Sequence, residues 1–398
     1  MNDKTTLLVA GVQMDVAIGE HGQNRDRMEH YLRQAAGQGA KLIVFPECAL
    51  SGYCFESLDE ARPHAEGIPG PSTERLAAVC RELNVFAVVG LLEADGRRLF
   101  NAAALLGPAG VIGSYRKVHL PYLGIDMWTT PGDRPFAVWD TGPARVGMSI
   151  CYDAAFPEAS RVMALQGADV ICLPTNWPPG AECTADFVIN ARALENHVYF
   201  VAANRVGTER GFTFIGRSKI CDTAGRVLAL AGDDQEQIIY AEIDPAIARR
   251  KHVIRVPGKH EIHRFADRRP ELYGQIVEPV TIPSPWPGRH AVSAPTRRQR
   301  IEGLLADDPH DVFLRYGLAL EHDKEGNHER GLLLLGELMR QQPPYVAAFF
   351  MSAQILERHD RVEEARDALR SGIETARMQG EQHAAGEMAE FLAQLGNR

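Results

Sequence analysis

The feature that most constrains the fold is an alternation of two hydrophobic patterns between residues 6 and about 245. Short apolar runs at 7–12, 42–45 and 85–91 are typical of buried strands. Between the first two runs, residues 28–36 place apolar side chains at helical spacing. Such β-α-β alternation implies a sheet that is covered by helices on at least one face.

The same patterns continue through the middle of the chain. Helices are predicted from about Ser72, from Pro157, whose ring suits a first helical position, and over 186–197. Further strands are predicted at 100–106, 111–115, 145–150, 170–173 and 198–203, and three more, with an antiparallel character, at 212–215, 227–230 and 238–243.

A proline-rich segment then interrupts the pattern. Five prolines fall within residues 279–296, which is typical of a boundary or a semi-rigid linker. Beyond residue 298 only helical patterns occur. We therefore predict a main domain at 1–278, a linker at 279–298 and an all-helical region at 299–398.

An internal repeat occurs in the helical region. Residues 311–319 align with residues 345–353 at an offset of 34, so that Val312 matches Val346. A helix-turn-helix period of this length resembles tetratricopeptide repeats. Generic helical hairpins are the alternative interpretation. Because two repeats bury little core, we expect this region to lean on the main domain or on a protein partner.

Composition excludes several classes of protein. The net charge is −9 with a pI near 5.9, and no broad basic face suggests nucleic-acid binding. No apolar run reaches the length of a membrane helix, and the N-terminal residues lack a signal-peptide pattern, so the cytoplasm is the expected compartment. The seven cysteines include no CxxC pair, which argues against a disulfide framework or a zinc ribbon.

Three segments carry residues that could perform chemistry, each at the end of a predicted strand. Glu47 follows the strand at 42–45, Lys117 follows the strand at 111–115, and Cys151 follows the strand at 145–150. Taken singly, each has an ordinary explanation: a capping or ion-paired carboxylate, a solvated lysine and a buried inert thiol.

Together the three residues form a workable nucleophilic triad. The Glu47 carboxylate takes the thiol proton of Cys151 and returns it to a leaving amine. The Lys117 ammonium stabilises negative charge on the carbonyl oxygen and favours the thiolate.

The flanking residues of this triad resemble the nitrilase, or carbon–nitrogen hydrolase, superfamily. The matching motifs are FPE then GY around Glu47, YRK then HL around Lys117, and CYD then FPE at Cys151. The resemblance spans roughly residues 6–276 and includes weaker matches at 173–177, 192–196, 203–207, 216–218 and 269–273. It implies a four-layer α-β-β-α sandwich, assembly of sandwiches face to face into at least dimers, and no metal or organic cofactor.

One segment departs from the family pattern. Many members have a second glutamate between the lysine and a Pro-Gly turn, which is Pro131-Gly132 in this chain. No glutamate occurs here, and Asp126 is the nearest carboxylate. Asp126 either takes the role of that glutamate, with a side chain one methylene shorter, or is a surface-loop residue.

The residues after the cysteine indicate the bond that is attacked. Nitrilases of the superfamily tend to have Trp-Glu there, whereas Tyr152-Asp153 resembles the amidase and carbamoyl-amide branches. We expect hydrolysis of a small carboxamide or N-carbamoyl compound through a thioester, with ammonia released. Nitrile hydrolysis is the alternative reaction. The alternative outside enzymes is a scaffold that binds a protein through its helical repeats.

Substrate contacts are predicted from residues near the strand ends. The candidates for lining the pocket are Tyr53, Trp128, Tyr152, Phe156, Asn176 and Trp177. Arg192 and Arg205 could bind a substrate carboxylate or form ordinary ion pairs. His260 and His263 have a metal-like spacing but no third ligand nearby in sequence, so no metal site is predicted.

Overall fold

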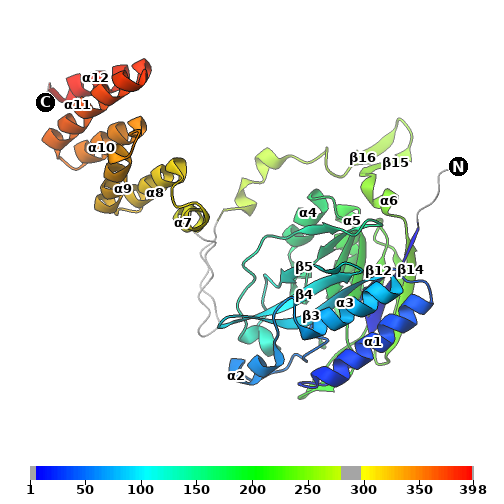
Figure 1. The fold of residues 1–398 in the computed structure, drawn as a ribbon. Helices are drawn as coiled ribbons and strands as arrows, with labels where there is room; N and C mark the ends of the chain where they lie inside the picture. Colours follow the sequence, from blue (N-terminus) through cyan, green and yellow to red (C-terminus); the bar gives the residue numbers. More distant parts are fainter. Residues whose placement is uncertain (1–5, 279–296, 397–398) are drawn as a thin grey trace. The chain divides into compact units, whose positions relative to one another are not determined.

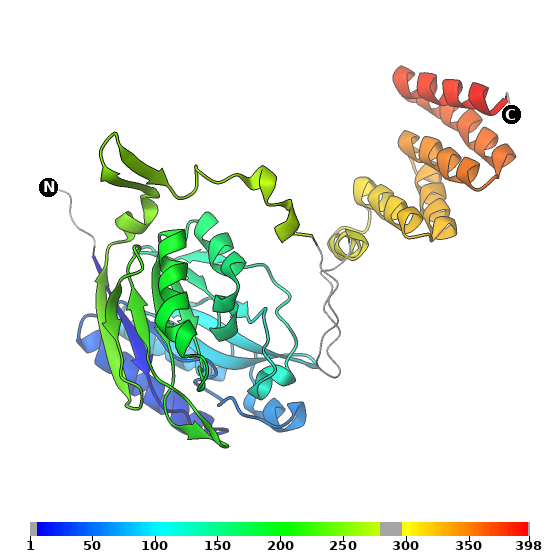
Figure 2. The same cartoon turned by 180° about the vertical axis from the view of Figure 1, so that it is seen from behind.

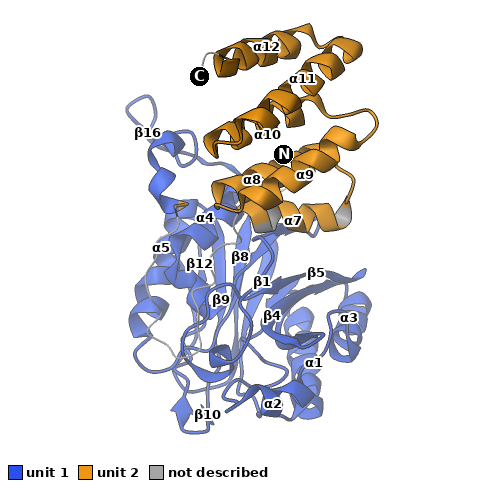
Figure 3. Ribbon diagram, turned by 90° about the vertical axis from the view of Figure 1, so that its left-hand side faces the viewer, with its two compact units in different colours: residues 1–276 blue, residues 277–398 orange. Residues whose placement is uncertain are grey.

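The computed structural model describes residues 6–278 and 297–396, and the chain divides into two compact units after Ile276 (Figure 3). Most of the predicted linker, residues 279–296, lies outside the described residues. In the described part of the chain, no helix combines the length and the apolar character that a membrane span requires.

The first unit contains two six-stranded sheets (Figure 1). Parallel pairing joins β1 to β2 and β2 to β3, whereas β14, β4 and β5 pair antiparallel with their neighbours. In spatial order, the first sheet consists of β14 (Gln237–Ile243), β1 (Leu7–Gln13), β2 (Leu42–Val44), β3 (Phe86–Asp95), β4 (Arg98–Gly107) and β5 (Gly110–Arg116).

The second sheet has the same plan, with parallel strands at its centre. Parallel pairing joins β7 to β8 and β8 to β9, and antiparallel strands flank them. Its order is β13 (Val227–Leu230), β12 (Lys219–Cys221), β9 (Tyr199–Ala203), β8 (Val170–Pro174), β7 (Arg145–Met148) and β6 (Val138–Asp140).

The two sheets pack face to face with helices outside them. Val44 and Val88 of the first sheet share one buried cluster with Met148 and Val201 of the second. Helices α1 (His21–Gly37) and α3 (Pro71–Leu83) cover the outer face of the first sheet. Helices α4 (Pro157–Leu165) and α5 (Ile189–Asn196) cover that of the second, and are the green helices in front in Figure 2. The predicted four-layer α-β-β-α sandwich is confirmed.

Some predicted boundaries are wrong. The strand predicted at 145–150 ends at Met148, and the helix predicted at 186–197 opens with a π-helical turn at Thr184–Val188. The strand predicted at 212–215 is only β11 (Phe212–Thr213), which pairs with β10 (Thr208–Glu209) outside both large sheets. Smaller elements are α2 (Leu58–Ala61), α6 (Pro245–Arg249), and a hairpin of β15 (His252–Val256) and β16 (His260–His263).

The second unit is entirely helical among its described residues. Its helices are α7 (Arg297–Asp307), α8 (Val312–Lys324), α9 (His328–Arg340), α10 (Val346–Arg358), α11 (Val362–Gln379) and α12 (Gln382–Gly396). Helices α8 and α10 begin 34 residues apart, as do α9 and α11, which agrees with the period read from the sequence. Their assignment as tetratricopeptide repeats stays a prediction.

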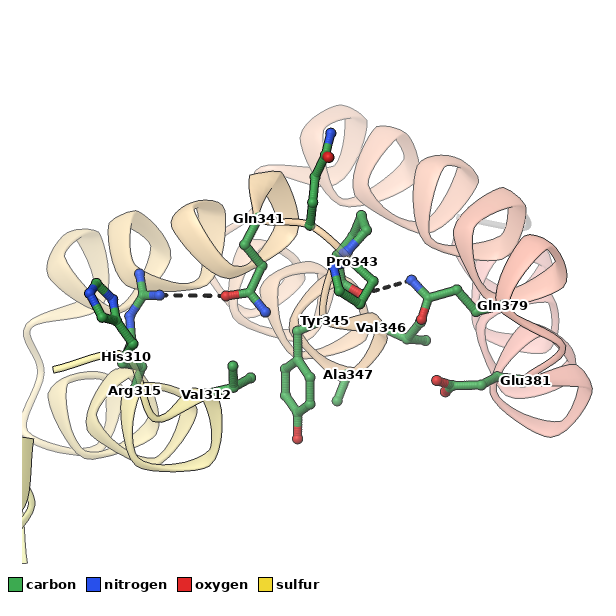
Figure 4. A pocket seen from close by; sticks show the side chains of 12 residues that line it. His310, Val312, Arg315, Gln341, Pro343, Tyr345, Val346, Ala347, Gln379 and Glu381 are labelled. Atoms are coloured by element: carbon green, nitrogen blue, oxygen red, sulfur yellow. Dashed lines mark hydrogen bonds between the residues drawn. The ribbon is translucent and has the colours of Figure 1, made fainter. Parts of the chain in front are cut away.

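The helical unit has a pocket of its own between its repeats (Figure 4). The ring of Tyr345 and the side chains of Val312 and Val346 line it, with Arg315 and Gln379 at opposite ends. Gln379 donates a hydrogen bond to the carbonyl of Pro344 at 2.8 Å, which joins α11 to the turn before α10.

Candidate active site

Glu47, Lys117 and Cys151 each lie just beyond the carboxyl end of a strand. Glu47 follows β2, and Lys117 follows β5, which is parallel to β3 because both strands are antiparallel to β4. Cys151 follows β7 of the second sheet. Ligands of α/β sheets commonly bind beyond the carboxyl ends of strands, which is where all three residues lie.

A close main-chain approach fixes the position of Glu47. The segment Pro46–Cys48 lies against β3 at Gly90, where a Cβ would stand 2.3 Å from the Pro46 carbonyl oxygen and 2.8 Å from Glu47 Cα. Only glycine leaves room for this contact. Cys48 has a φ of 48°, a left-handed conformation that turns the chain sharply after Glu47.

Cys151 also sits in a left-handed conformation, with a φ of 46°, at the start of a 3-10 turn (Cys151–Ala155). Non-glycine residues in this region are strained and cluster at functional sites. Asp153 holds the turn, because its Oδ2 accepts from Ile150 N–H at 2.9 Å and from the Tyr115 hydroxyl at 2.7 Å. Its Oδ1 accepts from His119 N–H at 3.0 Å, which ties the Lys117 segment to the Cys151 turn.

Lys117 lies between two carboxylates. Its Nζ donates to Glu47 Oε1 at 2.7 Å and to Asp126 Oδ2 at 2.5 Å. All three side chains are completely buried. Burial alone would lower the pKa of Lys117, but the charges of Asp126 and Glu47 outweigh it and hold the pKa well above its ordinary value. Lys117 is therefore a fixed ammonium.

The second carboxylate oxygen of Glu47, Oε2, is buried and has no hydrogen-bond partner among the described residues. Burial raises the pKa of Glu47, although the Lys117 charge and the Asn101 amide act against this rise. A carboxylate with a raised pKa and one unengaged oxygen is suited to accept a proton.

The Cys151 thiol is protonated at neutral pH. Burial, together with the negative charge of Glu47, raises its pKa to about 12, even though Lys117 and the main-chain N–H of Asn176 favour the thiolate. A nucleophilic role for Cys151 therefore requires a base, and the carboxylate of Glu47 is a charge that acts on this thiol.

Asp126 lies in a 3-10 turn (Gly124–Met127) and is fully buried, so its interpretation as a surface-loop residue is wrong. Tyr53 donates its hydroxyl hydrogen bond to Asp126 Oδ2 at 2.8 Å and is itself buried. Tyr53, predicted to line the pocket, thus has its hydroxyl engaged with Asp126.

The other predicted pocket residues differ in exposure. The side-chain nitrogen and oxygen of Asn176 are buried and have no partner among the described residues, while its main-chain N–H acts on Cys151. Trp177 is buried, whereas Trp128 and Tyr152 are each 41% exposed. The Tyr152 ring packs edge-on against Phe156. Of the predicted pocket residues named here, Asn176 combines unengaged polar side-chain atoms with a main-chain N–H that acts on Cys151.

Two arginines that could have bound a substrate carboxylate form structural contacts instead. Arg205 is fully buried and pairs with Glu209 at 2.7 Å and Asp15 at 3.0 Å. Arg192 pairs with Glu195 at 3.1 Å and donates to the carbonyl of Ala154. The ion-pair interpretation of both residues is confirmed.

Sequence reasoning missed two residues of the site. Asn101 of β4 contacts both Glu47 and Asp126, and Asp153 joins the Lys117 and Cys151 segments. Asn101 stands as the one amide within the apolar run 99–106, and this interruption was the available signal. Asp153 belongs to the CYD motif, and the local sequence gives no sign of its contacts with the Lys117 segment.

Among the described residues, one group could hold a metal ion: Asp323, His328 and His359 of the helical unit. Both oxygens of the Asp323 carboxylate are already engaged, with His328 Nδ1 and Arg358 Nη2, each at 2.7 Å. The carboxylate therefore serves an ion-pair network between helices.

Comparison with known proteins agrees with the fold. A family model described as carbon-nitrogen hydrolase matches residues 8–252. The "Nitrilase" of Pyrococcus abyssi is 43% identical over 270 residues, covering 67% of this chain and 98% of that protein. The N-carbamoylputrescine amidase of Solanum lycopersicum is 32% identical, covering 70% of this chain and 97% of that protein.

A solved structure is also similar. It is a mutant of the amidase from Nesterenkonia sp. AN1, with the acetamide moiety of fluoroacetamide covalently added at its active-site cysteine. It superimposes with a TM-score of 0.55 at 25% identity, covering 67% of this chain and 95% of that chain. The chain belongs to the carbon–nitrogen hydrolase family and is a hydrolase of carbon–nitrogen bonds.

Proposed function

We propose that the protein hydrolyses a small carboxamide or an N-carbamoyl compound through a thioester on Cys151. The observation that carries this proposal is the unengaged Glu47 Oε2, on a carboxylate whose charge acts on the protonated Cys151 thiol, with the Lys117 ammonium at 2.7 Å from the other Glu47 oxygen. These are the three groups that acyl transfer from an amide requires: a nucleophile, a base and a fixed positive charge.

In the first half of the reaction, Glu47 takes the thiol proton as Cys151 Sγ bonds to the substrate carbonyl carbon. The carbonyl oxygen gains negative charge, which Lys117 stabilises electrostatically. Glu47 then gives the proton to the nitrogen, the C–N bond breaks, and ammonia leaves. The products of this half are ammonia and the Cys151 thioester.

In the second half, Glu47 takes a proton from water as the water oxygen bonds to the thioester carbon. The C–S bond breaks and the proton returns to Cys151. A carboxamide and one water thus give an acid and ammonia. An N-carbamoyl amine and one water give the amine, carbon dioxide and ammonia.

Asp126 and Asn176 have supporting roles in this proposal. Asp126, at 2.5 Å from Lys117, takes the place of the family's second glutamate and holds the ammonium in position. Asn176 offers a buried amide with both polar atoms unengaged, which suits pairing with the carboxamide or ureido group of a substrate. Trp128, Tyr152 and Trp177 remain proposed wall residues.

Nitrile hydrolysis is the second candidate reaction, since the relative named nitrilase shares 43% identity with this chain. A nitrile would consume two waters and give the same acid and ammonia. The residues after the cysteine, Tyr152-Asp153, favour the amide or carbamoyl substrate.

Intact-mass spectrometry and product analysis test the proposal. The chain is incubated with panels of small amides, ureido compounds and nitriles, and ammonia, carbon dioxide and acid are measured. We expect an acyl adduct on Cys151, and its loss in Cys151→Ala. Hydrolysis that survives Cys151→Ala rules the mechanism out. Ammonia with carbon dioxide identifies a carbamoyl substrate, and turnover of nitriles alone establishes the second candidate.

We also propose a homodimer or larger assembly through the face formed by α4 and α5. Val162, Leu165, Phe187 and Leu194 on and beside these helices are between 38% and 69% exposed. A group of exposed apolar side chains is typical of an interaction surface. Light scattering of the wild type and of Phe187→Ser tests this, with a lower mass expected for the variant.

A cytoplasmic location and a protein partner for the helical repeats complete the proposal. All seven cysteines are free thiols, which suits a reducing compartment. A role as a scaffold would stand beside catalysis. Cell fractionation tests the location, and affinity capture by the full chain, compared with a Tyr345→Ala variant in the pocket of Figure 4, tests the partner.

A further inference from the structure

We infer that Asn101 is a positioning residue. It holds the carboxylates of Glu47 and Asp126 in fixed positions, and it directs the unengaged oxygen of Glu47 toward the thiol of Cys151. This inference rests on the proposed function. It concerns a residue outside the triad, on a strand that carries no reacting group.

The contacts of Asn101 converge on the site. Its Nδ2 donates to Glu47 Oε1 at 2.6 Å and to Asp126 Oδ1 at 2.9 Å. Its main-chain carbonyl accepts from Lys117 N–H at 2.8 Å. One residue of β4 thus contacts the base, the lysine and the carboxylate beside the lysine.

The chemistry of these contacts requires an amide. An Nδ2 group has two N–H donors, and here one goes to each of two carboxylates that would otherwise repel one another. An aspartate at this place would add a third negative charge and no donor. A lysine or arginine would add a second cation next to Lys117. A neutral double donor satisfies both carboxylates without changing the charge of the site.

These contacts restrict rotation of the Glu47 carboxylate group. Oε1 receives two donors, Lys117 Nζ and Asn101 Nδ2, whereas Oε2 receives none among the described residues. A carboxylate held by two donors on one oxygen cannot turn about its last bond without breaking both hydrogen bonds. Oε2 is therefore kept for the proton of Cys151.

Asn101 is also held on its far side. The thiol of Cys48 lies 3.5 Å from Asn101 Oδ1, and the Asn101 side chain is buried. Cys48 has the left-handed conformation that follows Glu47, so the turn carrying the base also orients the amide that positions it. Both the oxygen and the nitrogen of the Asn101 amide thus have partners, which fixes the orientation of the amide.

The test measures alkylation of Cys151, which requires removal of its proton but no knowledge of the natural substrate. Full-length wild type, Asn101→Leu and Asn101→Asp are treated with fluoroacetamide across a pH series, and labelling of Cys151 is followed by intact mass. Turnover of an amide that the wild type hydrolyses is measured per labelled site, so that unfolded protein is not counted.

We expect Asn101→Leu to slow Cys151 labelling and kcat by roughly 10- to 100-fold, the size of effect that misplacement of a reacting group produces, with KM little changed. The acid limb of the labelling rate should move to higher pH, because Asn101 lowers the pKa of Glu47 and its loss lets that pKa rise. Aspartate has nearly the same shape as asparagine and adds a negative charge. The acid limb of the labelling rate should therefore move to still higher pH in Asn101→Asp.

Asn24→Leu is the matched control. Asn24 is also fully buried, and its Nδ2 donates to the carbonyls of Ala17 and Leu50, at 2.7 and 3.0 Å. Its substitution removes these two hydrogen bonds and the one that Asn24 Oδ1 accepts from Ala17 N–H at 3.0 Å, without touching Glu47, Lys117 or Asp126. We expect a loss of stability but a wild-type acid limb and wild-type kcat per labelled site.

Asn101→Ser, which keeps one donor in a smaller side chain, is measured in case Asn101→Leu does not fold. If folded Asn101 variants label Cys151 at the wild-type rate with an unmoved acid limb, the positioning role is wrong. Failure of the proposed function looks different: the wild type is then not labelled at Cys151, or Cys151→Ala still hydrolyses the amide.

Discussion

The ammonium of Lys117 lies 2.5 Å from the carboxylate of Asp126, although aspartate is one methylene shorter than the glutamate common in the family. The turn that carries Asp126 lies close against Tyr53, whose carbonyl accepts from Ile125 N–H at 2.8 Å. At Gly124, with a φ of 50°, a Cβ would stand 2.4 Å from the Tyr53 ring. The turn is thus held against Tyr53, and from it the shorter side chain of Asp126 reaches Lys117.

Asp126→Asn is predicted to lower turnover by roughly 10- to 100-fold, because Lys117 loses the partner that fixes its position. Both limbs of the pH–rate profile should move to lower pH. Asp126 raises the pKa of Lys117 and also, by repulsion, that of Glu47, so its neutralisation lowers both. Steady-state kinetics across pH check this. Unchanged kinetics would reduce Asp126 to a structural residue.

Glu47→Gln is predicted to change how Cys151 labelling depends on pH. In the wild type, the rate should level off once Glu47 is ionised. Without the base, labelling should be slow at neutral pH and rise continuously with alkalinity, because burial keeps the thiol protonated. Loss of the Glu47 charge lowers the Cys151 pKa below about 12, so the rise should begin before that pH. A plateau at neutral pH in the variant would contradict this.

Gly90→Ala is predicted to displace Glu47, the proposed base. The new Cβ would stand 2.3 Å from the Pro46 carbonyl oxygen and 2.6 Å from Cys48 N, so the Glu47 segment must shift. Overpacking of this kind costs about 1–3 kcal/mol, and we expect activity to fall more than stability. Calorimetry and kinetics check this. The control is Gly37→Ala at the end of α1, where a Cβ meets no atom within 4 Å, and activity should be unchanged.

Arg116→Leu is predicted to destabilise the first unit by about 3–5 kcal/mol, since it leaves a buried carboxylate unpaired. Arg116 is 2% exposed and binds Glu93 through Nη2 at 2.6 Å and Nε at 2.9 Å. Lys117, the next residue in the chain, should be held less firmly in its position as well. Arg98→Ala, which removes an exposed partner of Asp95 and Asp133, should change the melting temperature little. Equal effects of the two substitutions would refute the argument.

Much of the fold was predictable because its signals are local. Strands such as β2 and β8 are short apolar runs, and the residues after them belong to motifs that can be read in one stretch of chain. The repeat period was predictable for the same reason. The two-residue strand β11 has no such signal, because its pairing with β10 depends on a turn rather than on apolar periodicity.

The partners of polar residues were not predictable, since they are set by contacts between distant segments. Arg205 pairs with Asp15, which is 190 residues away in sequence. Asn101 meets Glu47 from 54 residues away, on a strand that pairs with β3, the strand against which the Glu47 segment lies. Neither relationship leaves a pattern in the local sequence beyond a polar residue in an apolar setting.

The buried set of Glu47, Lys117 and Asp126 has a consequence for the departure of product. Two carboxylates surround one ammonium, so the resting site has one excess negative charge that burial does not screen. In the proposed reaction, a carboxamide enters as a neutral molecule, and the proton that leaves Cys151 departs with ammonia. A carboxylic acid formed there ionises into a like-charged neighbourhood. Electrostatic repulsion would therefore favour release of the acid formed in the proposed reaction and weaken inhibition of the site by that product.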